Sequence, residues 1–255
     1  MMGTFRGVFF DLFGTLLVYG DMSAAWSDWL AAFYNSLKVC GLSMSKEAFA
    51  LQCDGFFSRP EPPVRDDGLT VFECRIQALA KDTGLDLQDR DIHSTATVCL
   101  NAWQAHISLD QSALPVLETL KPEHTLALIS NFDHPPHVYS LLSTLGLAEF
   151  FDAVLVSGDT GVKKPDPRIF ALALKRTQLQ PHEAVYVGDT SEDIRGARAA
   201  GLCPVLIQRS ELNSNQVILD FRSTQQPLVC ESEVPTSAEG TRTIPELTVL
   251  PGILK

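Results

Sequence analysis

Helix-like and strand-like segments alternate through the second half of the chain, and this alternation limits the possible folds more than any other feature. Each of four segments with helical spacing is followed by a short apolar run, and in chain order they are 114–121, 125–130, 136–145, 153–156, 167–177, 184–187, 191–200 and 203–207. Such alternation with short loops is typical of a parallel sheet with crossover helices. The sequence therefore predicts an α/β fold with a Rossmann-like parallel sheet as its core.

Another apolar run, residues 5–10, comes first in the chain and predicts a buried parallel strand. Between it and the alternating region the sequence has the character of four helices, at 26–37, 48–57, 71–82 and 91–107. We therefore expect two domains. We expect residues 1–17 and 111–255 to form a discontinuous core and residues 18–110 to form an inserted four-helix domain.

The last part of the chain carries a weaker pattern. Residues 210–243 are polar, rich in Ser, Thr, Gln and Glu, and interrupted only by a short apolar run at 217–219. This composition predicts a long mobile excursion. Residues 244–254 are expected to form a short final element.

Charge and hydropathy exclude several classes of partner. The formal net charge of −11 argues against nucleic acid and anionic membrane surfaces, which require basic patches. It allows a small anionic substrate, because one lysine and a few helix N-termini can bind a phosphate locally. The six cysteines show no metal-type spacing, the first strand leaves no room for a signal peptide, and no apolar run approaches membrane-spanning length. We expect a cytoplasmic protein, and the oligomeric state stays open.

Polar side chains follow three of the predicted strands directly. Asp11 follows the strand at 5–10, Ser130 and Asn131 end the strand at 125–130, and Asp189 and Asp193 follow the strand at 184–187. The carboxyl ends of parallel strands are where open α/β sheets bind ligands. Each aspartate also has a structural explanation, as a turn residue or as part of an acidic helix start. Their joint occurrence favours a site.

In order and spacing these motifs, with Lys164 before Pro165 and Asp166, resemble the haloacid dehalogenase superfamily, subclass with a helical cap, over roughly residues 5–208. The resemblance implies a hydrolase that uses Mg²⁺ as cofactor. It implies that Asp11, Ser130 and Lys164 are catalytic, that Phe13, Thr15 and Asn131 contact the substrate, and that Asp11, the Phe13 main-chain carbonyl, Asp189 and Asp193 hold the metal.

Phe13 departs from the pattern of the family's phosphatases, which carry a second aspartate there as general acid and base. The resemblance therefore favours a Mg²⁺-dependent phosphatase of weak activity. A metal-independent 2-haloacid dehalogenase is the alternative, although the family's dehalogenases carry an early cap arginine, absent between Gly7 and Arg59, and a tyrosine where this chain has Phe170. A non-catalytic binding protein with the same fold is the third possibility.

Overall fold

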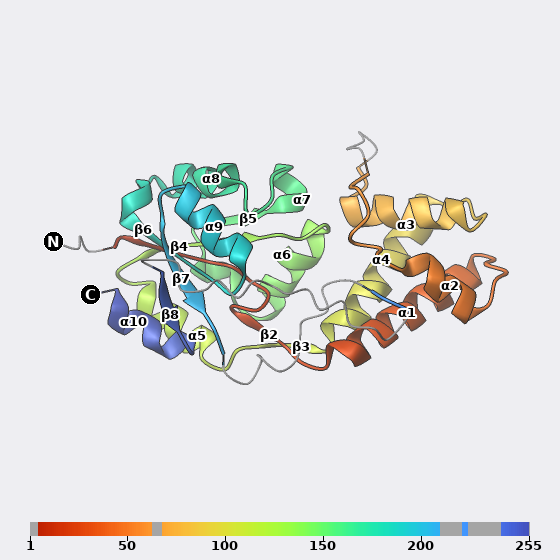
Figure 1. The fold of residues 1–255 in the computed structure, drawn as a ribbon, viewed down its shortest axis with the longest axis horizontal. Helices are drawn as coiled ribbons and strands as arrows, with labels where there is room; N and C mark the ends of the chain where they lie inside the picture. Colours follow the sequence, from red (N-terminus) through yellow and green to blue (C-terminus); the bar gives the residue numbers. More distant parts are fainter. Residues whose placement is uncertain (1–4, 63–67, 210–220, 224–240, 255) are drawn as a thin grey trace. The chain divides into compact units, whose positions relative to one another are not determined.

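The structure is a computed structural model that describes residues 5–62, 68–209, 221–223 and 241–254. Its central sheet has the strand order β5-β4-β1-β6-β7-β8 (Figure 1), and every neighbouring pair is parallel. The strands are β1 Gly7–Phe10, β4 Thr125–Ser130, β5 Ala153–Val156, β6 Ala184–Gly188, β7 Cys203–Ile207 and β8 Arg242–Ile244. The predicted parallel α/β sheet is confirmed.

Helices cover both faces of this sheet. Figure 1 shows α8 and α9 along one face and α5 and α10 along the other. The helices of this part are α5 Ala113–Leu120, α6 Pro135–Thr144, α7 Ser157–Thr160, α8 Pro167–Thr177, α9 Ser191–Ala199 and α10 Leu250–Ile253. Alternate residues of β1 face opposite sides, so Phe9 packs in the cluster under α8 with Ile169 and Phe170. Burial on both faces explains why β1 is apolar throughout.

The described residues divide into two compact units, 5–18, 109–209 and 241–254 in one and 19–62, 68–108 and 221–223 in the other. The second unit contains α1 Met22–Val39, α2 Lys46–Cys53, α3 Val71–Asp82 and α4 Asp89–Gln104. The residues of α1 that share one face by spacing, Trp26, Trp29 and Phe33 among them, are all buried, as the pattern predicts. Their rings pack edge-on against one another and against Phe56.

Two short strands lie where the chain passes from one unit to the other, and the sequence analysis missed both. They are β2 Leu17–Tyr19 and β3 Ile107–Leu109, which pair in a two-stranded sheet. Residue 107 was predicted to be the end of a helix, but α4 ends at Gln104. Three residues are too few for an alternating pattern to show, so these strands leave no clear signal in the sequence.

Residues 221–223 correct the predicted domain boundary, which placed all of 111–255 in the core. Phe221 is buried, and its ring lies 5.6 Å from that of Trp29. Its carbonyl accepts a hydrogen bond from the Gly55 amide, and the Ser223 hydroxyl donates to Asp54 over 2.8 Å. This segment therefore belongs to the helical unit. The rest of the predicted excursion, 210–220 and 224–240, lies outside the described residues, and residues 242–243 are part of β8.

Candidate active site

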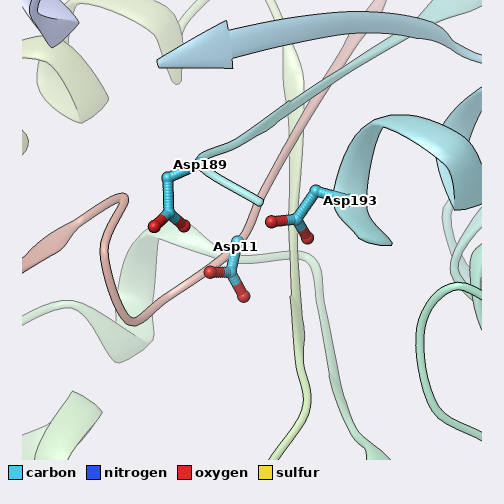
Figure 2. A group of neighbouring side chains, drawn as sticks. All are labelled: Asp11, Asp189 and Asp193. Carbon is cyan, nitrogen blue, oxygen red and sulfur yellow. The ribbon is translucent and has the colours of Figure 1, made fainter. Parts of the chain in front are cut away.

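Three carboxylates meet at the carboxyl edge of the sheet. Asp11 directly follows β1, Asp189 directly follows β6, and Asp193 lies in the first turn of α9 (Figure 2). Strands β1 and β6 are neighbours, and the Asp11 amide donates to the Val187 carbonyl over 2.9 Å. Carboxylate oxygens of the three residues lie within 4.8 Å of one another. The structure thus brings together the three acidic residues that the sequence predicted.

Lys164 is buried and compensates part of this negative charge. Its Nζ lies 2.5 Å from Oδ1 of Asp11 and 2.7 Å from Oδ1 of Asp193. Asn131 fixes the lysine's main chain, because its side-chain oxygen accepts from the Lys164 amide over 2.8 Å and its side-chain nitrogen donates to the Lys164 carbonyl over 3.0 Å. Asn131 therefore places the lysine, and the second hydrogen on its amide nitrogen is what it could still offer to a substrate.

Asp193 is held by several donors. Its Oδ1 accepts from Lys164 and from the Tyr186 hydroxyl, and its Oδ2 accepts from the Thr190 hydroxyl over 2.7 Å and the Thr190 amide over 3.0 Å. Thr190 is also the N-cap of α9 and accepts from the Asp193 amide, which completes a capping box. A side chain on Gly188 would collide with the Asp193 carboxylate, so a glycine is needed there. Both carboxylate oxygens of Asp193 therefore accept hydrogen bonds, and one of these bonds orients Lys164.

Tyr186 is a site residue that the sequence analysis missed. Its hydroxyl lies 3.1 Å from Nζ of Lys164 and 2.9 Å from Oδ1 of Asp193, and its ring packs edge-on against Phe170. Burial raises the pKa of Tyr186 well above its usual value, and the charge of Asp193 adds to the effect. The sequence held one signal for it, a tyrosine inside an otherwise aliphatic buried strand. A buried tyrosine hydroxyl needs a hydrogen-bond partner, so such a residue indicates a polar group nearby.

Negative charge exceeds positive charge inside the cluster. Burial raises the pKa of Asp11 to about 7, although the Lys164 charge opposes the shift. Burial also raises the pKa of Asp189 well above its usual range, and the charges of Asp11 and Asp193 raise it further. For Asp193 the effect of burial is outweighed by Lys164, which lowers its pKa. For Lys164 burial lowers the pKa, but the charges of Asp11 and Asp193 outweigh this and raise it. The negative charges of Asp11 and Asp189 are therefore only partly compensated by Lys164.

A divalent cation fits this cluster. The donors are carboxylate oxygens, which hard cations such as Mg²⁺ prefer, and their spacing allows several of them to reach one ion. A bound cation would also compensate the charges of Asp11 and Asp189 that Lys164 leaves uncovered. The acidic cluster is thus able to bind a metal.

Two hydroxyls border the cluster. Ser130, at the end of β4, is buried, and its Oγ has no hydrogen-bond partner among the described residues. A buried hydroxyl without a partner is costly, which suggests that a ligand supplies one. The buried Thr15 hydroxyl donates to Oδ1 of Asp189 over a long 3.4 Å. The sequence analysis expected Ser130 to be catalytic and Thr15 to contact the substrate, and both side chains border the acidic cluster.

Phe13 packs in a stack of three aromatic rings. Its ring lies 5.1 Å from that of Phe132, which in turn lies 5.6 Å from that of His137, and both pairs are nearly parallel. Burial, with a smaller contribution from His134, lowers the pKa of His137 to about 4, so the ring is neutral near pH 7. The residue at the position of the missing acid is thus apolar and packed.

The fold and this acidic site define an α/β enzyme that binds its ligand at the carboxyl ends of a parallel sheet. Residues 5–201 match the family described as haloacid dehalogenase-like hydrolase, and the chain belongs to that family of hydrolases. Among the described residues, no helix is both long and apolar enough to cross a membrane.

Relatives differ in how much of the chain they cover. A glyceraldehyde 3-phosphate phosphatase from Methanopyrus kandleri is 48% identical over 71 residues, which is 28% of this chain and 30% of that protein. Several similar relatives are likewise matched over only about a third of their length. A phosphoglycolate phosphatase from Salmonella typhimurium is 30% identical over 78% of this chain and 79% of its own.

The solved structures share the fold. A 2-haloacid dehalogenase from Pseudomonas syringae matches with a TM-score of 0.61 at 21% identity, over 98% of both chains. At this identity the likeness concerns the fold alone. It does not decide between phosphate and haloacid chemistry, which depends on individual side chains.

Proposed function

We propose that this protein is a Mg²⁺-dependent phosphatase that hydrolyses phosphate monoesters of small molecules through an aspartyl-phosphate on Asp11. The observation that supports this most is the cluster of Asp11, Asp189 and Asp193 with one buried lysine, because its uncompensated negative charge suits a divalent cation. Relatives named glyceraldehyde 3-phosphate phosphatase and phosphoglycolate phosphatase support small phosphate esters as the substrate class.

The proposed reaction has two steps at Asp11. First, a carboxylate oxygen of Asp11 attacks phosphorus and the bond from phosphorus to the ester oxygen breaks, so the alcohol leaves as its anion, which takes a proton from water. Second, water attacks the aspartyl-phosphate, which regenerates the carboxylate and releases inorganic phosphate. Lys164 favours the ionised form of Asp11 and opposes the effect of burial on its pKa, because its ammonium is bonded to that carboxylate. The Ser130 hydroxyl is free to donate to a phosphate oxygen.

The metal would be held by Asp11, the Phe13 main-chain carbonyl, Asp189 and Asp193. When bound, Mg²⁺ supplies positive charge that stabilises the charge on the phosphate oxygens. Asp193 contributes mainly by orienting Lys164, since both of its oxygens already accept hydrogen bonds. Thr15 supports Asp189 through its hydroxyl.

Phe13 limits the leaving groups that we expect the enzyme to accept. No carboxylic acid stands at this position to protonate the departing oxygen. Esters whose alcohols leave readily as anions should therefore react much faster than simple alkyl esters. The net charge of −11 disfavours nucleic acid as a partner. The free thiols of Cys53 and Cys99 support a reducing, cytoplasmic location.

One observation favours a second candidate, metal-independent dehalogenation of a small 2-haloacid. Phe13 is compatible with that chemistry, in which the leaving halide needs no proton. The half-buried Asp189 opposes it, because an extra carboxylate beside Asp11 without a cation would make the nucleophile harder to keep ionised. We therefore place dehalogenation second.

An activity assay separates the two. The protein is incubated with p-nitrophenyl phosphate and with 2-chloropropionate, each in the presence of Mg²⁺ and in the presence of EDTA. We expect release of p-nitrophenol that depends on Mg²⁺ and no release of chloride. A panel of phosphoglycolate, glyceraldehyde 3-phosphate and phosphoserine then ranks small esters. Chloride release in EDTA would replace the phosphatase assignment by dehalogenation, and no turnover of any substrate would favour a binding protein.

A further inference from the structure

Arg209, just beyond the end of β7, makes three hydrogen bonds that lie outside the catalytic cluster. One terminal nitrogen donates to the Gly14 carbonyl over 2.6 Å, and the other donates to the Thr15 carbonyl over 2.8 Å and to Oδ2 of Asp110 over 2.6 Å. The side chains of Arg209 and Asp110 are only 14% and 13% exposed. This is a partly buried, charge-assisted network rather than a solvated surface ion pair.

The two carbonyls belong to the turn that carries Asp11 into β2. This turn, residues 11–16, is compact, because the amides of Leu16 and Leu17 both donate to the Leu12 carbonyl and the Gly14 amide donates to the Leu17 carbonyl. It also contains the proposed nucleophile and the main-chain carbonyl of Phe13. Any displacement of this turn would therefore move groups that the proposed reaction uses.

The same two residues face Asp189 on their other side. Gly14 has a φ of 88°, and a side chain there would collide with the Asp189 carboxylate, so the main chain lies directly against that group. The Thr15 hydroxyl donates to Oδ1 of Asp189. The guanidinium of Arg209 thus binds the main-chain carbonyls of Gly14 and Thr15, the two residues that contact the Asp189 carboxylate.

Asp110 fixes the arginine from the opposite direction. Its Oδ1 accepts from the Ser112 amide over 2.8 Å, and its own amide donates to the Leu16 carbonyl over 2.9 Å. Asp110 therefore contacts the turn through its main chain and Arg209 through its side chain. A planar guanidinium can satisfy two carbonyls and a carboxylate at once, whereas an ammonium at the same place has no such fixed fork.

We propose that Arg209, oriented by Asp110, is a positioning residue of the active site. It holds residues 11–16 so that Asp11 and Asp189 keep the mutual distance that metal binding requires. The metal part of this inference rests on the proposed function, while the control of the turn itself does not. Residues that orient metal ligands without touching the metal commonly change affinity by about 10- to 100-fold.

The test compares Arg209→Gln and Arg209→Lys with Arg176→Gln. Arg176 is a matched control, since its guanidinium also donates to a main-chain carbonyl, that of Val154, but far along the chain from residues 11–16. Two quantities are measured on the full chain, the dissociation constant of Mg²⁺ by calorimetry and the rate of amide hydrogen exchange in a peptide covering residues 11–17. Thermal unfolding is recorded alongside, to separate general destabilisation from a local effect.

We expect Arg209→Gln to weaken Mg²⁺ binding by about 10-fold or more and to accelerate exchange of the Leu16 and Leu17 amides. Arg209→Lys should give intermediate values of both quantities, and Arg176→Gln should leave both at the parental value. Asp110→Asn should act in the same direction, and the double variant should be no worse than Arg209→Gln, because the two residues act as one unit. A lower melting temperature with parental Mg²⁺ affinity and parental exchange would overturn the inference.

The outcome stays separable from that of the proposed function. If the parent binds Mg²⁺ and Arg209→Gln binds it equally well with parental amide exchange, the positioning role falls and the proposed function is unaffected. If the parent binds no Mg²⁺, the metal part of both proposals falls, and the exchange measurement alone decides whether Arg209 controls the turn.

Discussion

The Nζ of Lys164 lies 2.5 Å from Oδ1 of Asp11, although 153 residues separate the two in the chain. Two features bring them together. Asp11 directly follows strand β1, and Asn131, which directly follows the neighbouring strand β4, binds both main-chain polar groups of Lys164. The lysine is therefore placed by the sheet as well as by the helix that follows it.

Replacing Asp11 by Asn tests the nucleophile. The amide is nearly isosteric but a poor nucleophile, so phosphatase turnover should fall by about 10⁴-fold or more while the fold persists. Asp159→Asn is a matched control, because it removes an exposed carboxylate that bonds to Tyr139 instead. Rates on p-nitrophenyl phosphate and circular dichroism are the measurements. Activity within a few-fold of the parent would show that the covalent mechanism is wrong.

Replacing Asp189 by Asn tests the metal site. One charge is removed from a cluster of three carboxylates, two of them buried, that has a single lysine, so the metal-free variant should unfold at the same temperature as the parent or higher. Mg²⁺ at about 100 times its dissociation constant should stabilise the parent by about 2.7 kcal/mol and the variant far less. Thermal unfolding with Mg²⁺ and with EDTA measures both. Equal Mg²⁺ stabilisation of parent and variant would contradict the assignment.

The longer strands of the fold could be predicted from the sequence, and the three-residue strands could not. Strands such as β4 and β6 are buried on both faces, so their sequences are apolar runs with clear limits. β2, β3 and β8 have three residues each, and a pattern of that length is not distinguishable from a loop. The packing of Phe221 on Trp29 depends on a long-range contact that no local pattern encodes.

The candidate site divides in a similar way. The sequence pointed to Asp11, Ser130 and Asp189 because each stands at the end of an apolar run or directly after one, and to Asp193 because it lies at the start of the helix that follows such a run. Tyr186 was missed because it lies within such a run, and the partners of its hydroxyl, Lys164 and Asp193, belong to other segments of the chain. Arg209 was missed because its partners, Gly14 and Thr15, are main-chain carbonyls, which leave no trace in the sequence.

His137 should make the protein less stable in mild acid. Its pKa is about 4 in the folded state and about 6.5 in an unfolded chain, so the unfolded state binds more protons between these values. The free energy of unfolding should therefore fall as pH falls through this window, by up to about 1.4 kcal/mol per pH unit. Urea unfolding across the window measures the slope. His137→Gln should lessen it and the exposed His182→Gln should not; an unchanged slope in His137→Gln would contradict the burial of that ring.

Phe221→Ala tests whether residues 221–223 belong to the helical unit. The side chain is buried against Trp29, so its truncation should destabilise that unit by about 3–5 kcal/mol. Tryptophan fluorescence during urea unfolding is a suitable measurement, because Trp29 is the direct neighbour. Val39→Ala, at a position 91% exposed in the same unit, is the control. A loss below about 1 kcal/mol would mean that the segment does not pack there.

Phe13→Asp tests the role of the missing acid. A positioned general acid contributes about 10²–10⁴-fold, and its benefit is largest when the leaving group is a poor one. If the protein is a phosphatase that lacks this group, the variant should gain most on alkyl phosphates and little on aryl phosphates. Phe13→Asn is the matched control, since it has the same shape without a transferable proton.

Stability must be measured beside the rate, because Phe13 is buried in the ring stack with Phe132 and its loss can cost about 3–5 kcal/mol. A gain shared by Phe13→Asp and Phe13→Asn would point to a wider pocket instead of proton transfer. A variant that stays folded, binds Mg²⁺ and gains nothing on alkyl phosphates would mean that Phe13 lines a pocket for a different substrate. The phosphatase mechanism would then lose its account of the leaving group, and the dehalogenase alternative, whose leaving halide needs no proton, would become the stronger one.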